Sequence, residues 1–535
     1  MARRVRVACL QLPARDLEDA AAALEHALRR IGEAAAGGAR LVVLPECTYP
    51  AYFLRSREAY DAAGLLPDAE LLTLLGDRAR RHGIYLAAGV VLTDPESGRL
   101  HNAGVLFGPD GRELARHAKS FLWHFDTVWF QPGGRFPVVE TEVGRLGMLI
   151  CADGRQPEVA RSLAVQGAQV LLDLTAWVTW GTRPQEFQSP HCTHLMPVRA
   201  LENGVWVVAA DKVGVEADSI VYTGRSGVID PWGRWTVQGS PDGDEVVFAE
   251  IDPDAAPGPP AARRPVLYAD LTRETAELPA MARLREPLVP DAAAGCVAAV
   301  QVETARPGAA VEAVRRLYCT LRGQGAQVVV APTLVEPDGG DALSALRELT
   351  RREGGALVLG LREERDGAAY LTGYLLEDGR VRLVHRATHA LRGAPAEAFD
   401  LGDAPCPVVE TAAGSVGLLV GAEGLVPEVS RSLMLRGAEF LLWTAPARYG
   451  MLDAVARTRA DENRVYVAAA APAGGESGAL VVGPQAQVLA VALAGRPMGV
   501  TAQVNRALTR WKDMAPGTNV LTNRLPGRYG PLAAP

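Results

Sequence analysis

One segment of the chain occurs twice. The sequence GMLICADGRQPEVARSL, residues 147–163, returns as GLLVGAEGLVPEVSRSL in residues 417–433. At a shift of 270, residues 137–167 and 407–437 share 17 identities in 31 positions, which identifies an internal duplication. A chain of 535 residues is also too long for one hydrophobic core. We therefore expect two homologous domains in tandem.

The domain boundaries follow from composition. Residues 252–265, DPDAAPGPPAARRP, are rich in Pro and Ala and lack periodicity, so they are expected to be an exposed connector. The predicted first domain covers residues 1–275, a linker covers residues 276–292, and the second domain covers residues 293–535.

The charge and cysteine content exclude several classes of protein. A formal charge of −7 and a pI near 5.8 give no reason to expect nucleic acid or anionic lipid as a partner. No stretch approaches 18 apolar residues, so no membrane span is predicted, and RRVRVACLQL at residues 3–12 is interpreted as a first strand, not a signal peptide. Seven cysteines without CxxC spacing argue against a disulfide framework or a structural zinc site, and favour a reducing cytoplasm.

The hydrophobic pattern alternates between strands and helices in each copy. Short apolar runs such as 41–44, 85–91, 148–151 and 170–172 have the length of buried strands. Amphipathic stretches 17–31, 69–82 and 157–166 have the length of helices. Together they predict α/β layers. The turn sequences GPDG, residues 108–111, and DPWG, residues 230–233, predict hairpins and a partly antiparallel sheet.

Three reactive side chains in the first copy each follow a strand-like run. Glu46 ends LVVLPE, Lys119 lies in ARHAKS, and Cys151 lies in LGMLICADG. Residues at strand ends lie at the rim of a sheet, where side chains from several strands converge. Pro157 and Glu158 suit a first helical turn after Cys151, and a helix N-terminus is expected to lower the pKa of the thiol. Cys151 is therefore a candidate nucleophile.

Thiol attack on an amide also requires a base, an oxyanion partner and an acid for the leaving amine. Glu46 is suited to serve as base and then acid, and Lys119 as the oxyanion partner.

These motifs, LPE, HAK and CADGRQPE in this order, resemble the carbon–nitrogen hydrolases of the nitrilase superfamily. The resemblance covers the chain once per half and implies two tandem αββα sandwiches without a cofactor. It also implies that Glu46 is the general base, Lys119 the transition-state stabiliser and Cys151 the nucleophile. A second acid usually follows the lysine in this superfamily, and Asp126 stands at that position, one methylene shorter than the usual Glu.

Residues around the triad suggest which branch of the superfamily the chain resembles. Ala152 and Asp153 after the cysteine look more like amidases and N-carbamoyl amino acid hydrolases than nitrilases. In the carbamoylase branch an arginine after the cysteine holds the substrate carboxylate, and Arg155 matches it. The tryptophans of the loops expected to ring the site predict an aromatic-lined pocket. These are Trp123, Trp129, Trp177 and Trp180. The motif HCTH, residues 191–194, is too isolated to predict a metal site.

The second copy lacks the reactive groups. Sequence alignment places Thr333 at the position of Glu46, Thr388 at that of Lys119 and Gly421 at that of Cys151. This half is therefore predicted to be a pseudoenzyme. Members of the superfamily pair their sandwiches as αββα–αββα dimers, so the resemblance implies an intramolecular pseudo-dimer, with further homo-oligomers left open. The alternative is two independent domains joined by a linker, the second binding an unrelated ligand.

The sequence thus predicts an amidohydrolase that cleaves a primary amide or N-carbamoyl group of a small molecule through a thioester, with release of ammonia. A nitrilase and an acyltransferase remain open as enzymatic alternatives. A binding or regulatory protein without turnover is the alternative from another class.

Overall fold

The computed structural model describes residues 3–287, 294–304, 307–334, 339–392, 399–445, 450–474 and 478–534. The chain divides into two compact units. The first comprises Met1–Pro259, Asp513–Asn519 and Asn523–Leu532, and the second comprises Pro260–Lys512 with Val520–Thr522 and Ala533–Pro535. The division between the units thus falls within the Pro- and Ala-rich connector, and most of residues 513–532 group with the first unit.

The predicted linker, residues 276–292, includes helix α7 (Pro279–Arg285), and residues 288–292 lie outside the described part of the chain.

Two sheets form the centre of the first unit. One has seven strands in the order β10-β1-β2-β3-β4-β5, with β15 pairing with β1, and the other has six in the order β14-β13-β9-β8-β7-β6. The strands of the first sheet are β1 (Val5–Pro13), β2 (Leu41–Val43), β3 (Tyr85–Thr93), β4 (Leu100–Phe107), β5 (Glu113–Ala118), β10 (Lys212–Val213) and β15 (Glu245–Ile251). Those of the second are β6 (Val138–Thr141), β7 (Gly144–Ile150), β8 (Val170–Leu174), β9 (Trp206–Ala210), β13 (Gly227–Ile229) and β14 (Trp235–Gln238).

Both predicted hairpins are present. Strands β4 and β5 pair antiparallel, as do β13 and β14, whereas β1, β2 and β3 pair parallel.

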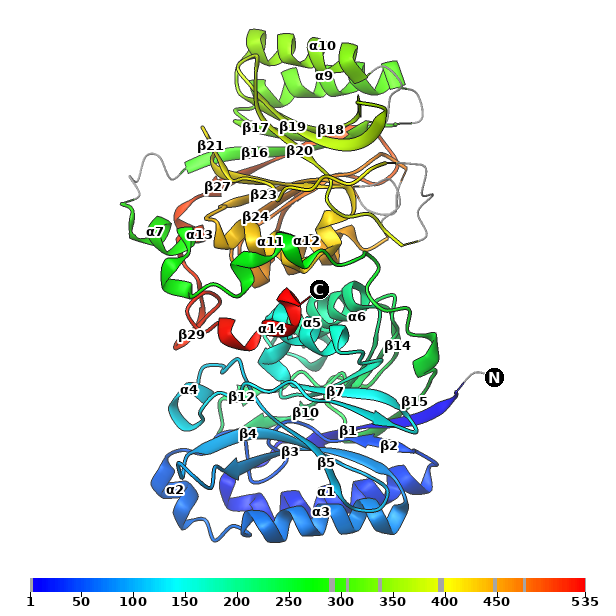
Figure 1. The fold of residues 1–535 in the computed structure, drawn as a ribbon. Helices are drawn as coiled ribbons and strands as arrows, with labels where there is room; N and C mark the ends of the chain where they lie inside the picture. The colour runs from blue at the N-terminus through cyan, green and yellow to red at the C-terminus, as the bar shows by residue number, and fades with distance from the viewer. Residues whose placement is uncertain are drawn as a thin grey trace. The chain divides into compact units, whose positions relative to one another are not determined.

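Helices cover the outer faces of both sheets. The helices of this unit are α1 (Ala20–Ala36), α2 (Arg57–Ala62), α3 (Asp68–His82), α4 (Asp126–Trp129), α5 (Pro157–Val165) and α6 (Met196–Asn203). Figure 1 shows α1 and α3 along the outer face of the first sheet. Strand β1 explains the layers, because its side chains alternate between two cores. Ala8 and Leu10 pack with α1 and α3, while Val7 and Cys9 pack between the two sheets.

The second unit repeats this plan. Its sheets run β20-β19-β18-β17-β16-β27 and β21-β22-β23-β24-β25-β26. The first contains β16 (Ala294–Gln301), β17 (Val328–Leu334), β18 (Ala356–Arg365), β19 (Ala368–Glu377), β20 (Arg380–Arg386) and β27 (Met498–Asn505). The second contains β21 (Val409–Thr411), β22 (Gly414–Val420), β23 (Phe440–Thr444), β24 (Tyr466–Ala470), β25 (Leu480–Val482) and β26 (Val488–Val491).

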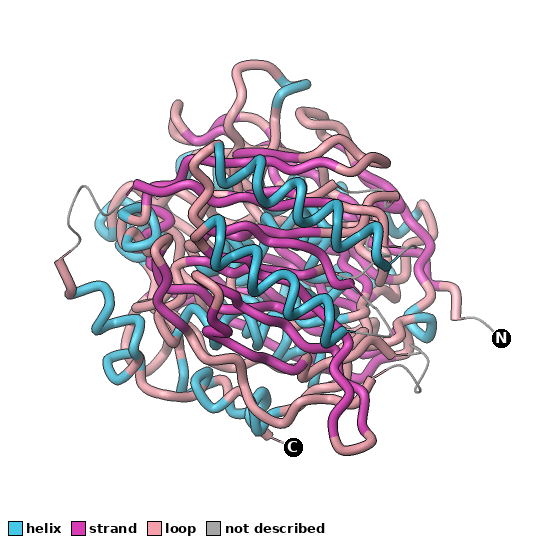
Figure 2. Tube along the Cα trace, turned by 90° about the horizontal axis from the view of Figure 1, so that it is seen from above, coloured by secondary structure: helices cyan, strands magenta, loops and turns pink. Residues whose placement is uncertain are grey.

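Helices flank these sheets as well. They are α9 (Pro307–Gly323), α10 (Gly339–Glu353), α11 (Pro427–Leu435) and α12 (Leu452–Asn463). In Figure 2 the helices α9 and α10 run side by side across the strands of their sheet. The predicted fold class, two tandem αββα domains, is therefore confirmed for each unit by itself.

Among the residues described, every helix is too short or too polar to cross a bilayer.

The two copies retain the same internal brace. In the first unit Arg199 donates from Nε to Gly154 O (2.8 Å) and pairs with Glu202 (2.6 Å). In the second unit Arg459 makes the equivalent bonds to Gly424 O (2.8 Å) and Glu462 (2.6 Å). The duplication therefore preserved the support of the turn that carries Cys151 in the first copy, although the second copy has lost the cysteine.

Candidate active site

Glu46 lies in the loop that follows β2. The side chain is fully buried, and its Oε1 accepts hydrogen bonds from Lys119 Nζ (2.6 Å) and Asn102 Nδ2 (2.6 Å). The other oxygen, Oε2, accepts no hydrogen bond from the described residues. Close backbone packing fixes this loop, because a Cβ on Gly89 of β3 would lie 2.2 Å from Pro45 O. One carboxylate oxygen is thus anchored and the other is available to take a proton.

Lys119 follows the last residue of β5 and lies between two carboxylates. Its Nζ is 2.6 Å from Glu46 Oε1 and 2.5 Å from Asp126 Oδ2, with the Tyr52 ring centroid 5.8 Å away. Burial disfavours the ammonium, but Asp126 and Glu46 outweigh this effect, so the pKa of Lys119 is raised well above its ordinary value. Lys119 therefore remains a fixed positive charge, as an oxyanion partner must.

Asp126 begins helix α4 and is fully buried. Its Oδ2 also accepts a hydrogen bond from Trp123 N (2.8 Å). Burial raises the pKa of Asp126 to about 6, with Lys119 opposing this rise and Glu46 adding to it. The structure thus places Asp126 directly on the lysine, at the position where the resemblance expected a second acid.

Cys151 lies at the end of β7, where a short 3-10 helix (Cys151–Arg155) begins. It has φ +45°, a left-handed conformation that is costly for a non-glycine residue, and its N–H donates to Asp173 Oδ1 (3.1 Å). The residue is buried, with 6% of its surface exposed. Strained residues of this kind cluster at functional sites.

The expectation of a lowered pKa for Cys151 is wrong. Burial raises the pKa of the Cys151 thiol well above its ordinary value, the Glu46 carboxylate raises it further, and Lys119 opposes the change. Desolvation of the buried thiol is the largest cause of this rise. The resting thiol is therefore protonated, and attack requires a base to remove its proton.

Asp153 connects the Cys151 turn to the segment that follows Lys119. Its Oδ1 accepts hydrogen bonds from Ser120 N (2.9 Å), Ser120 Oγ (2.6 Å) and Phe121 N (2.9 Å). Its Oδ2 accepts from Ile150 N (3.1 Å) and lies 2.7 Å from His117 Nε2. Burial opposes ionisation, but His117 and these hydrogen bonds keep the pKa of Asp153 below its ordinary value. One carboxylate thus fixes the spacing of the nucleophile and the ammonium.

The other predicted site residues lie in different surroundings. The Arg155 guanidinium lies over the ring of Trp123, 4.5 Å from its centroid. Trp177 is fully buried and stacks on His191 at 5.8 Å between centroids. Trp129 stacks on Phe125 and lines a pocket of about 530 Å³ whose lining includes none of the three triad residues. The remaining tryptophan of the prediction, Trp180, is 58% exposed.

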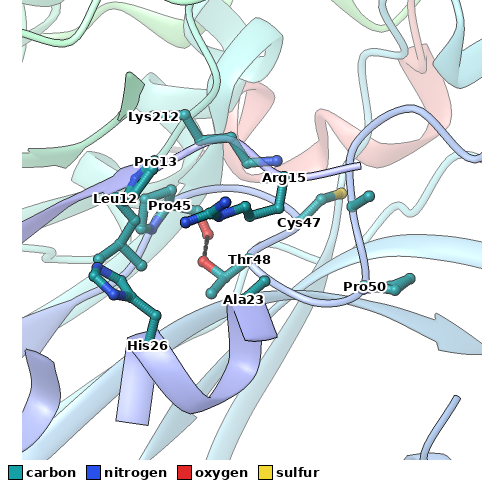
Figure 3. A pocket seen from close by; sticks show the side chains of 11 residues that line it. Leu12, Pro13, Arg15, Ala23, His26, Pro45, Cys47, Thr48, Pro50 and Lys212 are labelled. Atoms are coloured by element: carbon teal, nitrogen blue, oxygen red, sulfur yellow. Dashed lines mark hydrogen bonds between the residues drawn. The ribbon is translucent and has the colours of Figure 1, made fainter. Parts of the chain in front are cut away.

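A smaller cavity lies beside the loop that carries Glu46, with Pro45, Cys47 and Thr48 of that loop in its lining. Figure 3 shows it between Leu12, His26, Thr48 and Lys212, with Thr48 Oγ1 donating to Pro45 O (2.8 Å). Its volume is about 10 Å³, whereas ligand pockets measure about 300–1,000 Å³. It is too small to hold a substrate. In the part of the chain that the structure describes, no group of three or more His, Cys, Asp or Glu side chains is arranged to hold a metal ion.

The second unit has a filled site. Gly421 takes the left-handed conformation of Cys151, with φ +59°. Strand pairing places Trp443 where the first unit has Asp173, because Leu419 pairs with Trp443 as Leu149 pairs with Asp173. Trp443 is fully buried and donates from Nε1 to Gly421 O (2.9 Å). The indole thus packs against the backbone of the position that bears the nucleophile in the first unit.

One register in the sequence alignment of the copies is wrong by a residue. Lys119 donates its N–H to Asn102 O (2.8 Å), and Ala387 donates likewise to Leu371 O (2.8 Å). Thr388 instead matches Ser120, because its N and Oγ1 both donate to a buried carboxylate, that of Glu423. The counterpart of Lys119 is therefore Ala387, not Thr388. An alanine supplies no cation either, so the loss of the group stands.

Asn102 and Asp173 are two contacts of the triad that the sequence analysis missed. Both are polar residues within buried strands, β4 and β8. Comparison of the copies would have found them, because Leu371 and Trp443 occupy the equivalent positions in the unit that lacks the triad.

Comparison with known proteins identifies the family. The family model for carbon-nitrogen hydrolases matches residues 6–257 and again residues 297–512. The chain therefore belongs to the carbon-nitrogen hydrolase family, with two copies of its domain, and the class of activity is hydrolysis of carbon–nitrogen bonds.

Several relatives of known activity cover a little under half of the chain. A nitrilase of Pyrococcus abyssi is 35% identical over 224 residues, which are 42% of this chain and 80% of that protein. An omega-amidase of Xenopus tropicalis is 34% identical over 43% of this chain and 82% of its own length. An (R)-stereoselective amidase of a Pseudomonas species is 34% identical over 43% of this chain and 79% of its own. Among solved structures, an amidase of a Nesterenkonia species matches 47% of this chain and 92% of its own, at 28% identity and a TM-score of 0.40.

Proposed function

We propose that the first unit hydrolyses a primary amide or an N-carbamoyl group through a thioester on Cys151. The observation that carries this proposal is the Lys119 ammonium, held 2.6 Å from Glu46 and 2.5 Å from Asp126. The strained Cys151 lies close enough that its thiolate form would help to raise the pKa of Lys119. The 34% identity to an omega-amidase and to an (R)-stereoselective amidase supports an amide substrate.

The first half-reaction forms the thioester. Glu46 takes the proton of the Cys151 thiol on Oε2, the oxygen without a hydrogen bond from the described residues, and the sulfur attacks the carbonyl carbon. Lys119 stabilises the tetrahedral oxyanion. Glu46 then gives its proton to the departing nitrogen, the C–N bond breaks, and ammonia leaves.

The second half-reaction uses the same groups. Glu46 removes a proton from water, the hydroxide adds to the thioester carbonyl, and Lys119 again stabilises the oxyanion. The C–S bond breaks, the thiolate regains the proton from Glu46, and the carboxylic acid leaves. With an N-carbamoyl substrate, the amine is the other product and the carbamoyl group yields carbon dioxide and ammonia.

Ammonia release from matched substrates tests this proposal. The purified full chain is offered an amide, the corresponding nitrile and the corresponding N-carbamoyl compound, and Cys151→Ala serves as the control. Turnover of the amide or carbamoyl compound, lost in the variant, is the expected result. Turnover of the nitrile alone would support the alternative that the 35% identity to a nitrilase favours. Amide turnover that persists in Cys151→Ala would overturn the assignment.

We also propose that the second unit is a pseudoenzyme. Thr333, Ala387 and Gly421 replace the three reactive groups, and Trp443 fills the space beside Gly421, where a Cβ on Gly424 would lie 2.2 Å from its ring. If the second unit had its own turnover, Cys151→Ala would retain activity that a change in the second unit abolishes. The expected result is that Cys151→Ala retains none.

A further inference from the structure

The carboxyl-terminal segment of the chain belongs to the catalytic unit. After helix α13 (Ala507–Arg510) the chain forms a hairpin of β28 (Asp513–Ala515) and β29 (Thr518–Asn519), and it ends in helix α14 (Gly530–Ala533), coloured red in Figure 1. Residues 513–519 and 523–532 pack with the first unit, although the second copy lies between them and the rest of that unit in sequence.

One side chain of this segment binds the loop that carries Trp123. Thr518 is fully buried, and its Oγ1 donates to Leu122 O (3.0 Å) and accepts a hydrogen bond from His124 N (2.8 Å). A single hydroxyl thus satisfies the two backbone groups on either side of Trp123. Leu122 O is buried and His124 is half-buried. Backbone groups that are shielded from water are costly to leave unpaired, so this contact stabilises the conformation of the loop.

This loop positions the catalytic charges. Trp123 N, between the two groups bound by Thr518, donates to Asp126 Oδ2, the same oxygen that lies 2.5 Å from Lys119 Nζ. His124 has φ +45°, a conformation that a non-glycine residue adopts only when its surroundings enforce it. The chain of contacts therefore runs from Thr518 through the Trp123 loop to Asp126 and Lys119.

Two further contacts place the segment against the site. A Cβ on Gly517, at the turn of the hairpin, would lie 2.7 Å from Thr127 Oγ1, so the hairpin turn packs tightly on helix α4. Arg524 is 3.9 Å from Glu158, in the first turn of the helix that follows the Cys151 turn. The segment thus contacts both the lysine side and the cysteine side of the site.

We propose that Thr518 is a positioning residue of the hydrolase, which sets the Trp123 loop so that Asp126 holds Lys119 in its catalytic place. This inference rests on the proposed amide hydrolysis. It assigns to the last residues of the chain a role in the chemistry of a site whose reactive groups all lie in the first 151 residues.

The test compares three threonine variants of the full chain. Thr518→Val removes the hydroxyl at nearly constant volume, and Thr518→Ser retains it. Thr509→Val removes another buried hydroxyl, one that bonds to Arg506 O (2.7 Å) within the second unit. The readouts are kcat and KM for amide hydrolysis, the thermal midpoint, and hydrogen–deuterium exchange of the peptide that contains residues 120–131.

The expected result is a fall in kcat of about 10- to 100-fold in Thr518→Val, because a small misplacement of a catalytic group costs this much. Faster exchange at the His124 amide should accompany it. Thr518→Ser keeps the hydroxyl, and Thr509→Val removes one in the second unit, so both should stay within about twofold of the parent in kcat. The effect of Thr518→Val should appear in kcat and not in KM alone, because a loss confined to the transition state appears in kcat. Should Thr518→Val not fold, Gly517→Ala displaces the hairpin from Thr127 and should lower kcat in the same way.

Several results would overturn the proposal. They are unchanged kcat and exchange in Thr518→Val, an equal loss in Thr518→Ser, a loss in KM alone, or a loss no larger than that in Thr509→Val. Exchange does not depend on turnover, so it tests the contact even if the parent protein hydrolyses no amide. Failure of the proposed function and failure of this inference are thus distinguishable.

Discussion

Replacing Asp153 by Asn should damage both stability and catalysis. The carboxylate accepts four hydrogen bonds from the chain and pairs with His117. Asparagine retains one oxygen for Ser120 and Phe121, but its amide nitrogen would face Ile150 N, a donor opposite a donor. The contact with His117 would change from charged to neutral.

The magnitude follows from these losses. Breaking one side of a buried pair costs about 3–5 kcal/mol, and hydrogen bonds to charged groups contribute about 1.5–3 kcal/mol each. We therefore expect a loss of about 3–5 kcal/mol in the free energy of unfolding near neutral pH. Burial raises the pKa of Asp153, but His117 and the hydrogen bonds outweigh it and leave the pKa lowered. The stability that ionised Asp153 contributes is therefore present above the ordinary aspartate pKa and lost as pH falls through the lowered value. Burial lowers the pKa of His117, but the hydrogen bond and the charge of Asp153 outweigh it and leave the pKa raised. The stability that protonated His117 contributes is therefore present below the ordinary histidine pKa and lost as pH rises through the raised value.

The second unit supplies a matched control. Glu423 accepts hydrogen bonds from Val420 N (2.9 Å) and Thr388 N (2.8 Å) and pairs with His385 (2.9 Å). Burial opposes its ionisation, but His385 and the hydrogen bonds from Thr388 lower its pKa from 4.5 to about 2. This difference corresponds to about 3 kcal/mol of stability, present above pH 4.5 and lost as pH falls through about 2. Glu423→Gln should therefore destabilise its unit to a similar degree.

Denaturant unfolding and steady-state kinetics of the two variants separate the roles. Asp153→Asn should lower kcat about 10- to 100-fold, because Asp153 sets the spacing of the Cys151 turn and the Lys119 segment. Glu423→Gln should leave kcat unchanged at temperatures where both units are folded. If Asp153→Asn retains full kcat, or if both variants lose it equally, the argument that this contact positions the catalytic groups is refuted.

Three further predictions concern the residues of the active site. Cys151→Ala should lower amide turnover by about 10⁴-fold or more, measured as ammonia release, and turnover within tenfold of the parent would exclude a cysteine mechanism. Glu46→Gln should lower kcat by about 10²- to 10⁴-fold and slow alkylation of Cys151 by iodoacetamide, whereas an unchanged alkylation rate would show that Glu46 is not the base. With the pKa of Asp126 raised by burial to about 6, kcat/KM should fall as pH drops through that value, since a protonated Asp126 leaves Lys119 to pair with Glu46 alone and weakens Glu46 as a base. In Asp126→Asn this fall should disappear from the pH profile, and a profile identical to that of the parent would contradict the assignment.

The fold was largely predictable because the hydrophobic pattern and the duplication are local properties of the sequence. The stretches at residues 69–82 and 157–166 became α3 (Asp68–His82) and α5 (Pro157–Val165), each within a residue or so. The start of α1 was less predictable, since a 3-10 turn (Leu17–Asp19) precedes Ala20. The pseudo-dimer of the two copies stays a prediction, which small-angle scattering of the full chain would test.

The sequence predicted which residues form the site better than it predicted their protonation states and contacts. The motifs place Glu46, Lys119 and Cys151 at strand ends, but the pKa of a thiol depends on desolvation by residues distant in sequence. The contact of Thr518 with Leu122 spans 396 positions, and no periodic pattern connects residues so far apart. The register error at Thr388 has a similar origin, because only the hydrogen bonds of Ala387 and Lys119 show which residues are equivalent.

The most direct measurement is intact-mass spectrometry of the protein quenched during turnover of an amide, followed by peptide mapping. The account predicts a mass increase equal to one acyl group per chain, located on the peptide that contains Cys151 and absent from the Cys151→Ala variant. Turnover without any covalent adduct at Cys151 under single-turnover conditions, or an adduct located on another cysteine, would contradict it.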